Sequence, residues 1–139
     1  MDIDIQSILN KFIEGFILEE SKEQAHLELK DSKKRNLFLP KLLREWEAVI
    51  DMRYFHRLDV SNDTPETIKK SMYTKGRDLC YIISDHTDID NKIMEVDFII
   101  DKMYGEGFGY ILINLKADRI YLETAEKGNR FIGKKVDLT

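Results

Sequence analysis

The chain of 139 residues is poor in several features whose absence narrows its class. It has one cysteine, Cys80, so no disulfide can form within the chain, and a reducing compartment suits it. Cys80 stands in an apolar run, which indicates a buried side chain rather than a reactive thiol. No apolar run approaches the roughly 20 residues of a membrane span, and the acidic residues 1–4 lack the basic segment of a signal peptide. These absences predict a cytoplasmic protein that neither spans nor binds a membrane.

A concentrated basic segment is also missing. The longest basic run, Lys33–Arg35, has three residues and is predicted to be a solvated loop. Residues 85–106 contain seven carboxylates against two lysines, so this segment carries −5 while the whole chain carries −4. Because nucleic-acid phosphates require a basic surface, the charge pattern argues against a nucleic-acid partner. It favours a basic protein partner.

Length and composition predict one domain over residues 1–139, since 42% hydrophobic and 35% charged residues are typical of a globular protein. Two parts are distinguishable within it. Residues 1–76 are mainly helical, and residues 77–139 have the pattern of a β-α-β-β-β unit. We expect an α+β fold, in which N-terminal helices pack on a mostly antiparallel sheet of four to five strands.

The helical part begins with an amphipathic pattern at residues 5–17, with Asp4 or Ser7 as the N-cap. Residues 19–36 leave two alternatives open, a solvent-facing helix or a short edge strand at residues 26–30. Pro40 is expected in the first turn of the next helix, which would bury Trp46 against the sheet. A strand at residues 52–60 and a short helix from Pro65 to about Tyr73 complete this part.

The second part is organised around the apolar strand 79–84, which we expect to be covered on both faces. A helix over residues 91–104 follows and ends at Gly105, which is suited to the left-handed C-cap conformation. Three further strands, expected at residues 108–115, 119–124 and 130–136, form an antiparallel meander. The last of them is a candidate free edge, and pairing through this edge would form a homodimer.

No motif for catalysis, metal binding or a cofactor stands out. The loop Asp85–Asp90 offers three carboxylates and His86, but its spacing does not match a calcium loop, and a helix cap with solvated neighbours explains it better. The glycines at 105, 107 and 109 run from a helix into a strand, the reverse of a phosphate-binding loop. His26, His56 and His86 belong to separate elements and define no triad. We therefore expect no cofactor and no metal, and a non-enzymatic role is favoured.

The predicted helix 91–104 carries the most distinctive surface. On a helical wheel Asp90, Asp97 and Asp101 form an acidic stripe, and Met94 and Phe98 form a small apolar patch beyond it. Methionine and phenylalanine rimmed by carboxylates are typical of a surface that docks a basic protein. The alternative is that Met94 and Phe98 pack inside the core. The predicted protein-binding residues are Asp85, Asp88, Asp90, Met94, Asp97, Phe98 and Asp101.

The order of elements after residue 77 resembles that of small uncharacterised bacterial proteins, some of them suspected immunity proteins of polymorphic toxin systems. Three segments carry the resemblance: Cys80–Asp85, Gly107–Tyr110 and Arg130–Gly133. It implies a non-enzymatic binding role, in which an acidic surface occludes a basic site on a toxin. Two alternatives are a small-molecule-binding domain or minor enzyme, with a pocket at the end of strand 79–84, and a homodimeric domain of other function.

Overall fold

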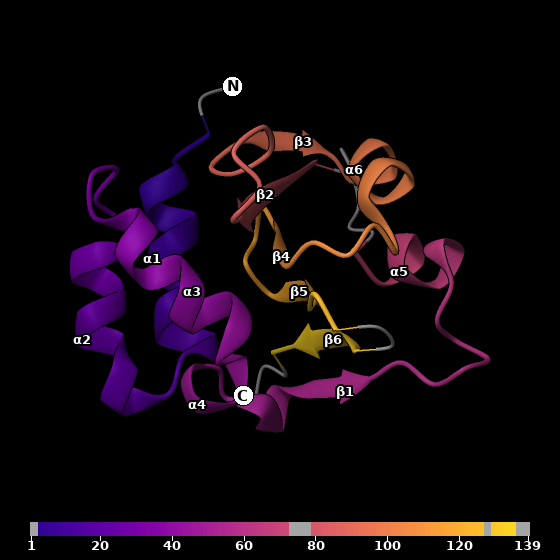
Figure 1. Cartoon of the computed structure of the whole chain (residues 1–139), viewed down its shortest axis with the longest axis horizontal. Coiled ribbons are helices and arrows are strands. Elements are labelled where there is room, and N and C mark those ends of the chain that lie inside the picture. Colours follow the sequence, from indigo (N-terminus) through magenta and orange to yellow (C-terminus); the bar gives the residue numbers. More distant parts are fainter. Residues whose placement is uncertain (1–2, 73–78, 127–128, 136–139) are drawn as a thin grey trace.

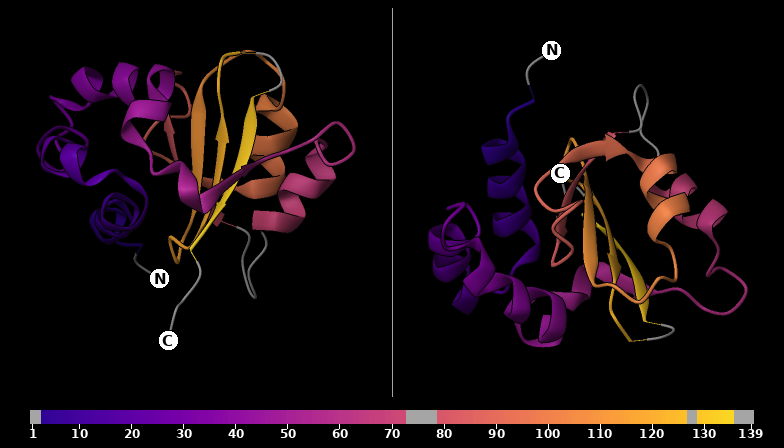
Figure 2. Two further views of the ribbon diagram at one scale, coloured as in Figure 1. Left: turned by 90° about the horizontal axis from the view of Figure 1, so that it is seen from below. Right: turned by 45° about the horizontal axis from the view of Figure 1, so that its top comes forward.

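A computed structural model describes residues 3–72, 79–126 and 129–135 of the chain. It shows an antiparallel sheet of six strands in the order β1-β6-β5-β4-β2-β3, with helices on both faces (Figures 1 and 2). The strands are β1 (Phe55–Arg57), β2 (Leu79–Ser84), β3 (Ile93–Glu95), β4 (Tyr110–Asn114), β5 (Arg119–Glu123) and β6 (Arg130–Lys134). The helices are α1 (Ile5–Phe16), α2 (Glu19–Glu28), α3 (Arg35–Arg44), α4 (Trp46–Val49), α5 (Pro65–Met72) and α6 (Val96–Met103). The α+β class is confirmed, with six strands in place of four or five. In the described part of the chain, no helix combines the length and the apolar character that crossing a membrane needs.

Strand β2 shows why the sheet is covered on both faces. Its side chains alternate between two cores: Tyr81 and Ile83 join the cluster under α1 to α4, whereas Cys80 and Ile82 join the cluster under α5 and α6. All four are fully buried. Because burial of a large apolar side chain stabilises a fold by about 1.5–3 kcal/mol, a strand that is apolar from Leu79 to Ile83 belongs in the middle layer.

The first two helices follow from their sequences. Asp4 caps α1, since its Oδ1 accepts a hydrogen bond of 3.1 Å from the backbone N–H of Ser7. The apolar stripe predicted for this helix is buried. The open alternative at residues 19–36 is decided in favour of a helix, because α2 extends to Glu28. Only Ala25 of α2 is fully buried, so this helix forms the outer layer of the N-terminal part.

The predicted position of Pro40 in the first turn of a helix was wrong. Helix α3 begins five residues earlier, at Arg35, and Pro40 lies inside it on the exposed side. An internal proline costs about 3 kcal/mol, but α3 buries an apolar stripe that includes Phe38 and Leu42, whose burial outweighs this cost. Trp46 is half-buried and packs on Phe131 of β6, with 5.0 Å between ring centroids.

The strand predicted at residues 52–60 is shorter, because a 3₁₀ turn at Met52–Tyr54 precedes the three-residue β1. Strand β1 pairs antiparallel with β6, Phe55 lying opposite Gly133. A Cβ atom at position 133 would lie 2.6 Å from Cζ of Phe55, so glycine allows β1 to cross closely. Strand β6 is therefore not a free edge, and the expectation of a homodimer through it loses its basis.

The predicted helix 91–104 was wrong in its first third. Asn91 adopts a left-handed conformation, with φ of 62°, and its N–H donates to the carbonyl oxygen of Ile82. This turn directs residues 93–95 back along β2 as strand β3, and α6 begins only at Val96. Met94 is therefore on a strand, and Asp90 precedes it in a loop. At the other end Gly105, with φ of 75°, has the predicted left-handed conformation.

Candidate functional site

Three loops meet at one end of the sheet, here called the Ser84 end. Strand β2 finishes there at Ser84, which lies opposite Tyr110, the first residue of β4. Tyr110 lies opposite Glu123 of β5, and Glu123 lies opposite Arg130 of β6. The chain segments 85–92 and 105–109 and the described residues 124–126 and 129 thus lie at this end, although up to 44 positions separate them in the sequence.

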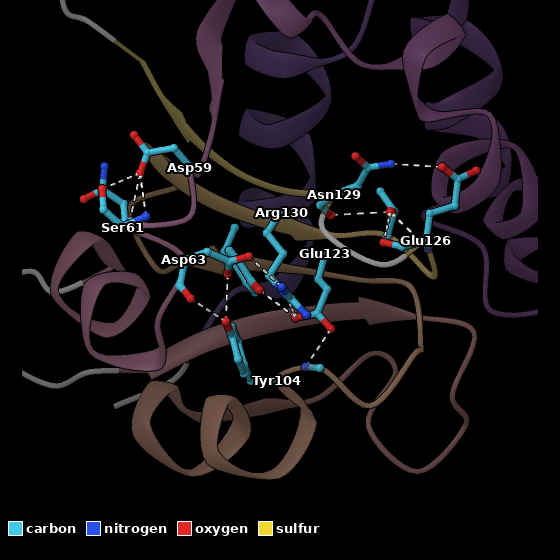
Figure 3. Close-up of polar contacts among 12 residues, drawn as sticks. Asp59, Ser61, Asp63, Tyr104, Glu123, Glu126, Asn129 and Arg130 are labelled. Atoms are coloured by element: carbon cyan, nitrogen blue, oxygen red, sulfur yellow. Dashed lines mark hydrogen bonds and ion pairs between the residues drawn. The ribbon is translucent and has the colours of Figure 1, made fainter.

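The Glu123 carboxylate is the centre of a buried polar network beneath the Ser84 end (Figure 3). Its side chain is 2% exposed, and its Oε1 accepts hydrogen bonds from the hydroxyls of Tyr110 (2.9 Å) and Tyr121 (2.6 Å). The same oxygen accepts from Nε of Arg130 at 3.3 Å, while Oε2 accepts from the backbone N–H of Gly105 at 3.0 Å. Four donors therefore satisfy this buried carboxylate.

Arg130 extends the network to the loop before α5. Its Nη1 donates to Oδ2 of Asp63 at 2.7 Å, and its guanidinium lies 4.4 Å from the centroid of the Tyr104 ring. The Tyr104 hydroxyl donates to the carbonyl oxygen of Asp63 at 2.6 Å and lies 2.8 Å from its Oδ1. Six side chains from five parts of the fold are thereby linked to one another, and Figure 3 labels four of them, Asp63, Tyr104, Glu123 and Arg130.

The electrostatics of this network fit a structural role. Burial and the nearby carboxylate of Glu123 raise the pKa of both Tyr110 and Tyr121 far above the ordinary value. Burial also raises the pKa of Tyr104, to about 12. These hydroxyls remain protonated donors at neutral pH, and each has its acceptor. A general base needs an acceptor position turned towards substrate, and the donors around Glu123 fill its positions from within the protein.

The network positions the loop from Gly105 to Gly109, between α6 and β4. Glu123 holds the start of the loop through the Gly105 N–H, and the hydroxyl of Ser84 donates to the carbonyl oxygen of Gly109 at 2.9 Å. Between these points the loop presents Phe108, which is 41% exposed. The Phe108 ring contacts His86 edge-on, with 4.7 Å between ring centroids. A large apolar side chain is thus held at the surface by its contact with His86 and by a loop that is hydrogen-bonded at Gly105 and Gly109.

Three exposed carboxylates belong to the loops around Phe108. Asp85 and Asp88 follow β2, and Glu106 precedes Phe108. Within residues 3–72, 79–126 and 129–135, none of these carboxylates has a hydrogen bond or ion pair. The loop after β2 is itself ordered, because the Oγ of Ser84 accepts from the N–H of His86 at 3.0 Å. The Ser84 end therefore combines an aromatic pair with three carboxylates that have no ion pair among the described residues, and one cation, Nζ of Lys92, lies 2.7 Å from the carbonyl oxygen of Asp88.

The other residues of the predicted protein-binding set do not join this surface. Asp90 forms a bidentate ion pair with Arg35 of α3, with distances of 2.8 Å to Nε and 2.9 Å to Nη2. Its Oδ1 also accepts from the N–H of Ser84 at 2.8 Å. Asp90 is consequently an internal tie between α3 and the loop after β2, and it contributes neither a helix cap nor a free charge.

Asp97 and Asp101 lie on α6, away from the Ser84 loops. Asp101 pairs with Lys69 of α5 at 2.7 Å, and Asp97 also attracts Lys69 electrostatically. Met94 is half-buried against the core under α5 and α6, whereas Phe98 is exposed next to Lys102. Strand β3 runs back along β2 to the Leu79 end of the sheet, where α6 begins. Phe98, in the first turn of α6, is therefore near the opposite end of the sheet from Phe108. The residues predicted to form one protein-binding surface therefore lie in separate parts of the structure.

The histidines lie on different elements. His26 on α2 contacts Glu14, His56 is on β1, and His86 contacts Phe108. In the described ranges no group of three or more His, Cys, Asp or Glu side chains is arranged to hold a metal ion. Sequence reasoning missed the Glu123 network. The signal was present, because Glu123 and Arg130 take opposite positions across the predicted meander turn.

Comparisons with known proteins identify no relative. No family model, no curated protein and no solved structure matches the chain.

Proposed function

We propose that this chain is a non-enzymatic binding protein, which uses the Ser84 end of its sheet to dock a basic protein partner. The observation that carries the proposal is Phe108, an exposed aromatic side chain on a loop fixed at both ends. Glu106 on the same loop, and Asp85 and Asp88 on the loop of its contact His86, are unpaired carboxylates among the described residues. A rigid aromatic anchor loses little conformational entropy on binding, which is a property of hot-spot residues.

The surrounding charges give the partner its chemistry. Asp85, Asp88 and Glu106 attract a basic surface over the Debye length of about 8 Å at physiological ionic strength. Charge complementarity of this kind accelerates association and fixes orientation. An immunity protein that covers the basic site of a toxin is a partner relationship of this kind, in line with the resemblance of the C-terminal 60 residues.

The test uses two pairs of matched variants. Asp85→Lys plus Asp88→Lys changes the charge of the Ser84 end by +4, and Asp97→Lys plus Asp101→Lys makes the same change on α6. Phe108→Ala and Phe98→Ala remove one exposed aromatic ring each. The first partner to test is the protein encoded by the neighbouring gene, since toxin and immunity genes lie side by side. Association and dissociation rates are measured by biolayer interferometry at several salt concentrations.

The lysine pair at the Ser84 end should lower the association rate by about tenfold or more and flatten its salt dependence. Phe108→Ala should accelerate dissociation by about 30-fold, the equivalent of a hot spot of about 2 kcal/mol. The α6 pair and Phe98→Ala should change both rates by less than about threefold. If the α6 variants weaken binding more than the Ser84-end variants, the docking face is elsewhere. If the neighbouring protein does not bind at all, the immunity role is overturned.

A further inference from the structure

A groove lined by α1, α3 and the segments after α2 and β2 has the chemistry of a ligand site. Its volume is about 320 Å³, at the lower end of the range for small-molecule pockets. Ile5 and Leu9 of α1 and Leu29, the residue after α2, form its apolar floor. Polar side chains from α1, from the loop after α2, from α3 and from the loop after β2 line the rim: Gln6, Lys30, Ser32, Arg35 and Asn91.

A chain of hydrogen bonds determines which atoms of the rim remain free. The guanidinium of Arg35, bound to Asp90, lies 5.6 Å from the centroid of the Tyr81 ring. The Tyr81 hydroxyl donates its proton to Oδ1 of Asn91 at 2.6 Å. Burial raises the pKa of Tyr81 to about 12, so the hydroxyl keeps this proton at neutral pH. Because Oδ1 of Asn91 accepts this proton, the NH₂ group of Asn91 remains as a donor at the groove.

Gln6 contributes both kinds of group, because its Nε2 donates to the carbonyl oxygen of Lys30 at 3.5 Å and its Oε1 is an acceptor. None of the described residues that line the groove is acidic. Lys30 uses one N–H for Oδ1 of Asn10, at 2.7 Å, and keeps two. The carbonyl oxygen of Leu29 already accepts from Nη1 of Arg35 at 3.0 Å. The charge of Arg35 is balanced by Asp90, which leaves the positive charge of Lys30 at the groove. N–H donors and a net positive charge are complementary to an anion.

We propose that this groove binds the anionic group of a small organic molecule, a carboxylate or a phosphate, through Lys30 and the Asn91 amide. The apolar floor accommodates the carbon skeleton of the ligand. This site is distinct from the docking surface at the Ser84 end, because α1, the segment after α2 and α3 supply its lining except Asn91, which comes from the end of the loop after β2. It needs neither a metal ion nor a cofactor.

The test is an NMR titration of the full chain at pH 7. Inorganic phosphate and succinate are added separately, sodium chloride at equal ionic strength serves as the reference, and the side-chain NH₂ signals of Asn91 and Gln6 are followed. A saturating shift at Asn91 is expected with at least one probe, with a dissociation constant on the order of 1 mM or lower. Phosphate alone, succinate alone or both can produce it, and each of these results supports the proposal while naming the preferred group.

Two lysine variants separate a site from general attraction. Lys30→Gln should weaken binding by about tenfold or more, because it removes a charge-assisted hydrogen bond. Lys33→Gln removes the same charge from an exposed lysine that does not line the groove, and it should change affinity by less than about twofold. The amide spectrum verifies that each variant is folded. A shift at Asn91 that is absent or grows linearly with both probes overturns the proposal, as does an equal effect of the two variants.

Discussion

Replacing Glu123 by glutamine tests whether the buried network holds the Ser84 end together. Glutamine has nearly the same shape but no charge, and one of its two terminal atoms is a donor. If the new NH₂ group takes the place of Oε2, it faces the N–H of Gly105. If it takes the place of Oε1, it faces Nε–H of Arg130 and the hydroxyls of Tyr110 and Tyr121. In either orientation at least two donors face each other. Arg130 also loses one of its two carboxylate partners. Breaking a buried charge pair costs about 3–5 kcal/mol, so the free energy of unfolding should fall by roughly that amount.

The assay is urea unfolding, followed by the fluorescence of the single tryptophan, Trp46. With a slope of about 2 kcal/mol per molar urea, the midpoint should fall by roughly 2 M. Glu126→Gln is the matched control, because the Glu126 side chain is exposed. Among the described residues its carboxylate hydrogen-bonds Asn129 alone, at 2.9 Å, and the change should alter stability by less than about 0.5 kcal/mol. In hydrogen exchange, the Gly105 amide should lose protection in Glu123→Gln alone. A Glu123→Gln protein that is within about 1 kcal/mol of wild type would refute the role given to this carboxylate.

Three further outcomes follow from local contacts. Asp90→Asn leaves the buried Arg35 guanidinium without its counter-charge and should lower the free energy of unfolding in urea by about 3 kcal/mol. The control Asp88→Asn, at an exposed position without an ion pair in the described residues, should lower it by less than about 0.5 kcal/mol. Equal losses in the two variants would contradict the assigned ion pair. Gly133→Ala should destabilise the protein by about 1–3 kcal/mol, because the new Cβ meets the Phe55 ring. Gly15→Ala, in helix α1 where the new Cβ makes ordinary contacts, should stabilise it by up to about 1 kcal/mol. The same sign for both variants would be evidence against the close crossing of β1 and β6. Burial raises the pKa of Tyr81 to about 12 from the ordinary value near 10. The contribution of the protonated Tyr81 hydroxyl to the free energy of unfolding is therefore complete below pH 10 and is lost as the pH rises from 10 to 12, by about 1.4 kcal/mol per pH unit. A urea midpoint that stays constant from pH 9.5 to 11.5 would exclude this loss.

The elements that sequence reasoning placed well are those decided by periodicity. The apolar stripe of α1 and the unbroken apolar run of β2 each admit one structure, an amphipathic helix and a central strand, and both form as predicted. Gly105 follows from the same logic, since a helix that ends before a strand favours a residue free to take positive φ. In these segments local preference and tertiary packing act in the same direction.

The errors lie where tertiary contacts override the local pattern. Residues 93–95 fit a helical wheel, but the left-handed turn at Asn91 and the pairing with β2 make them a strand. Pro40 suggested a helix start, but the buried side of α3 extends the helix back to Arg35. The candidate site suffered most. Arg35 and Asp90 are 55 positions apart, and Asp63 and Arg130 are 67 apart. Charges that appear free along one segment are neutralised by residues that only the fold brings near.

Hydrogen exchange of the complex tests the central claim most directly. Once the partner is bound, the amides of residues 85–92 and 105–109 should gain protection together, while those of α6 and of the α2–α3 hairpin should exchange as in the free protein. Protection that is confined to α6, or that leaves the Phe108 loop unchanged, would contradict docking at the Ser84 end.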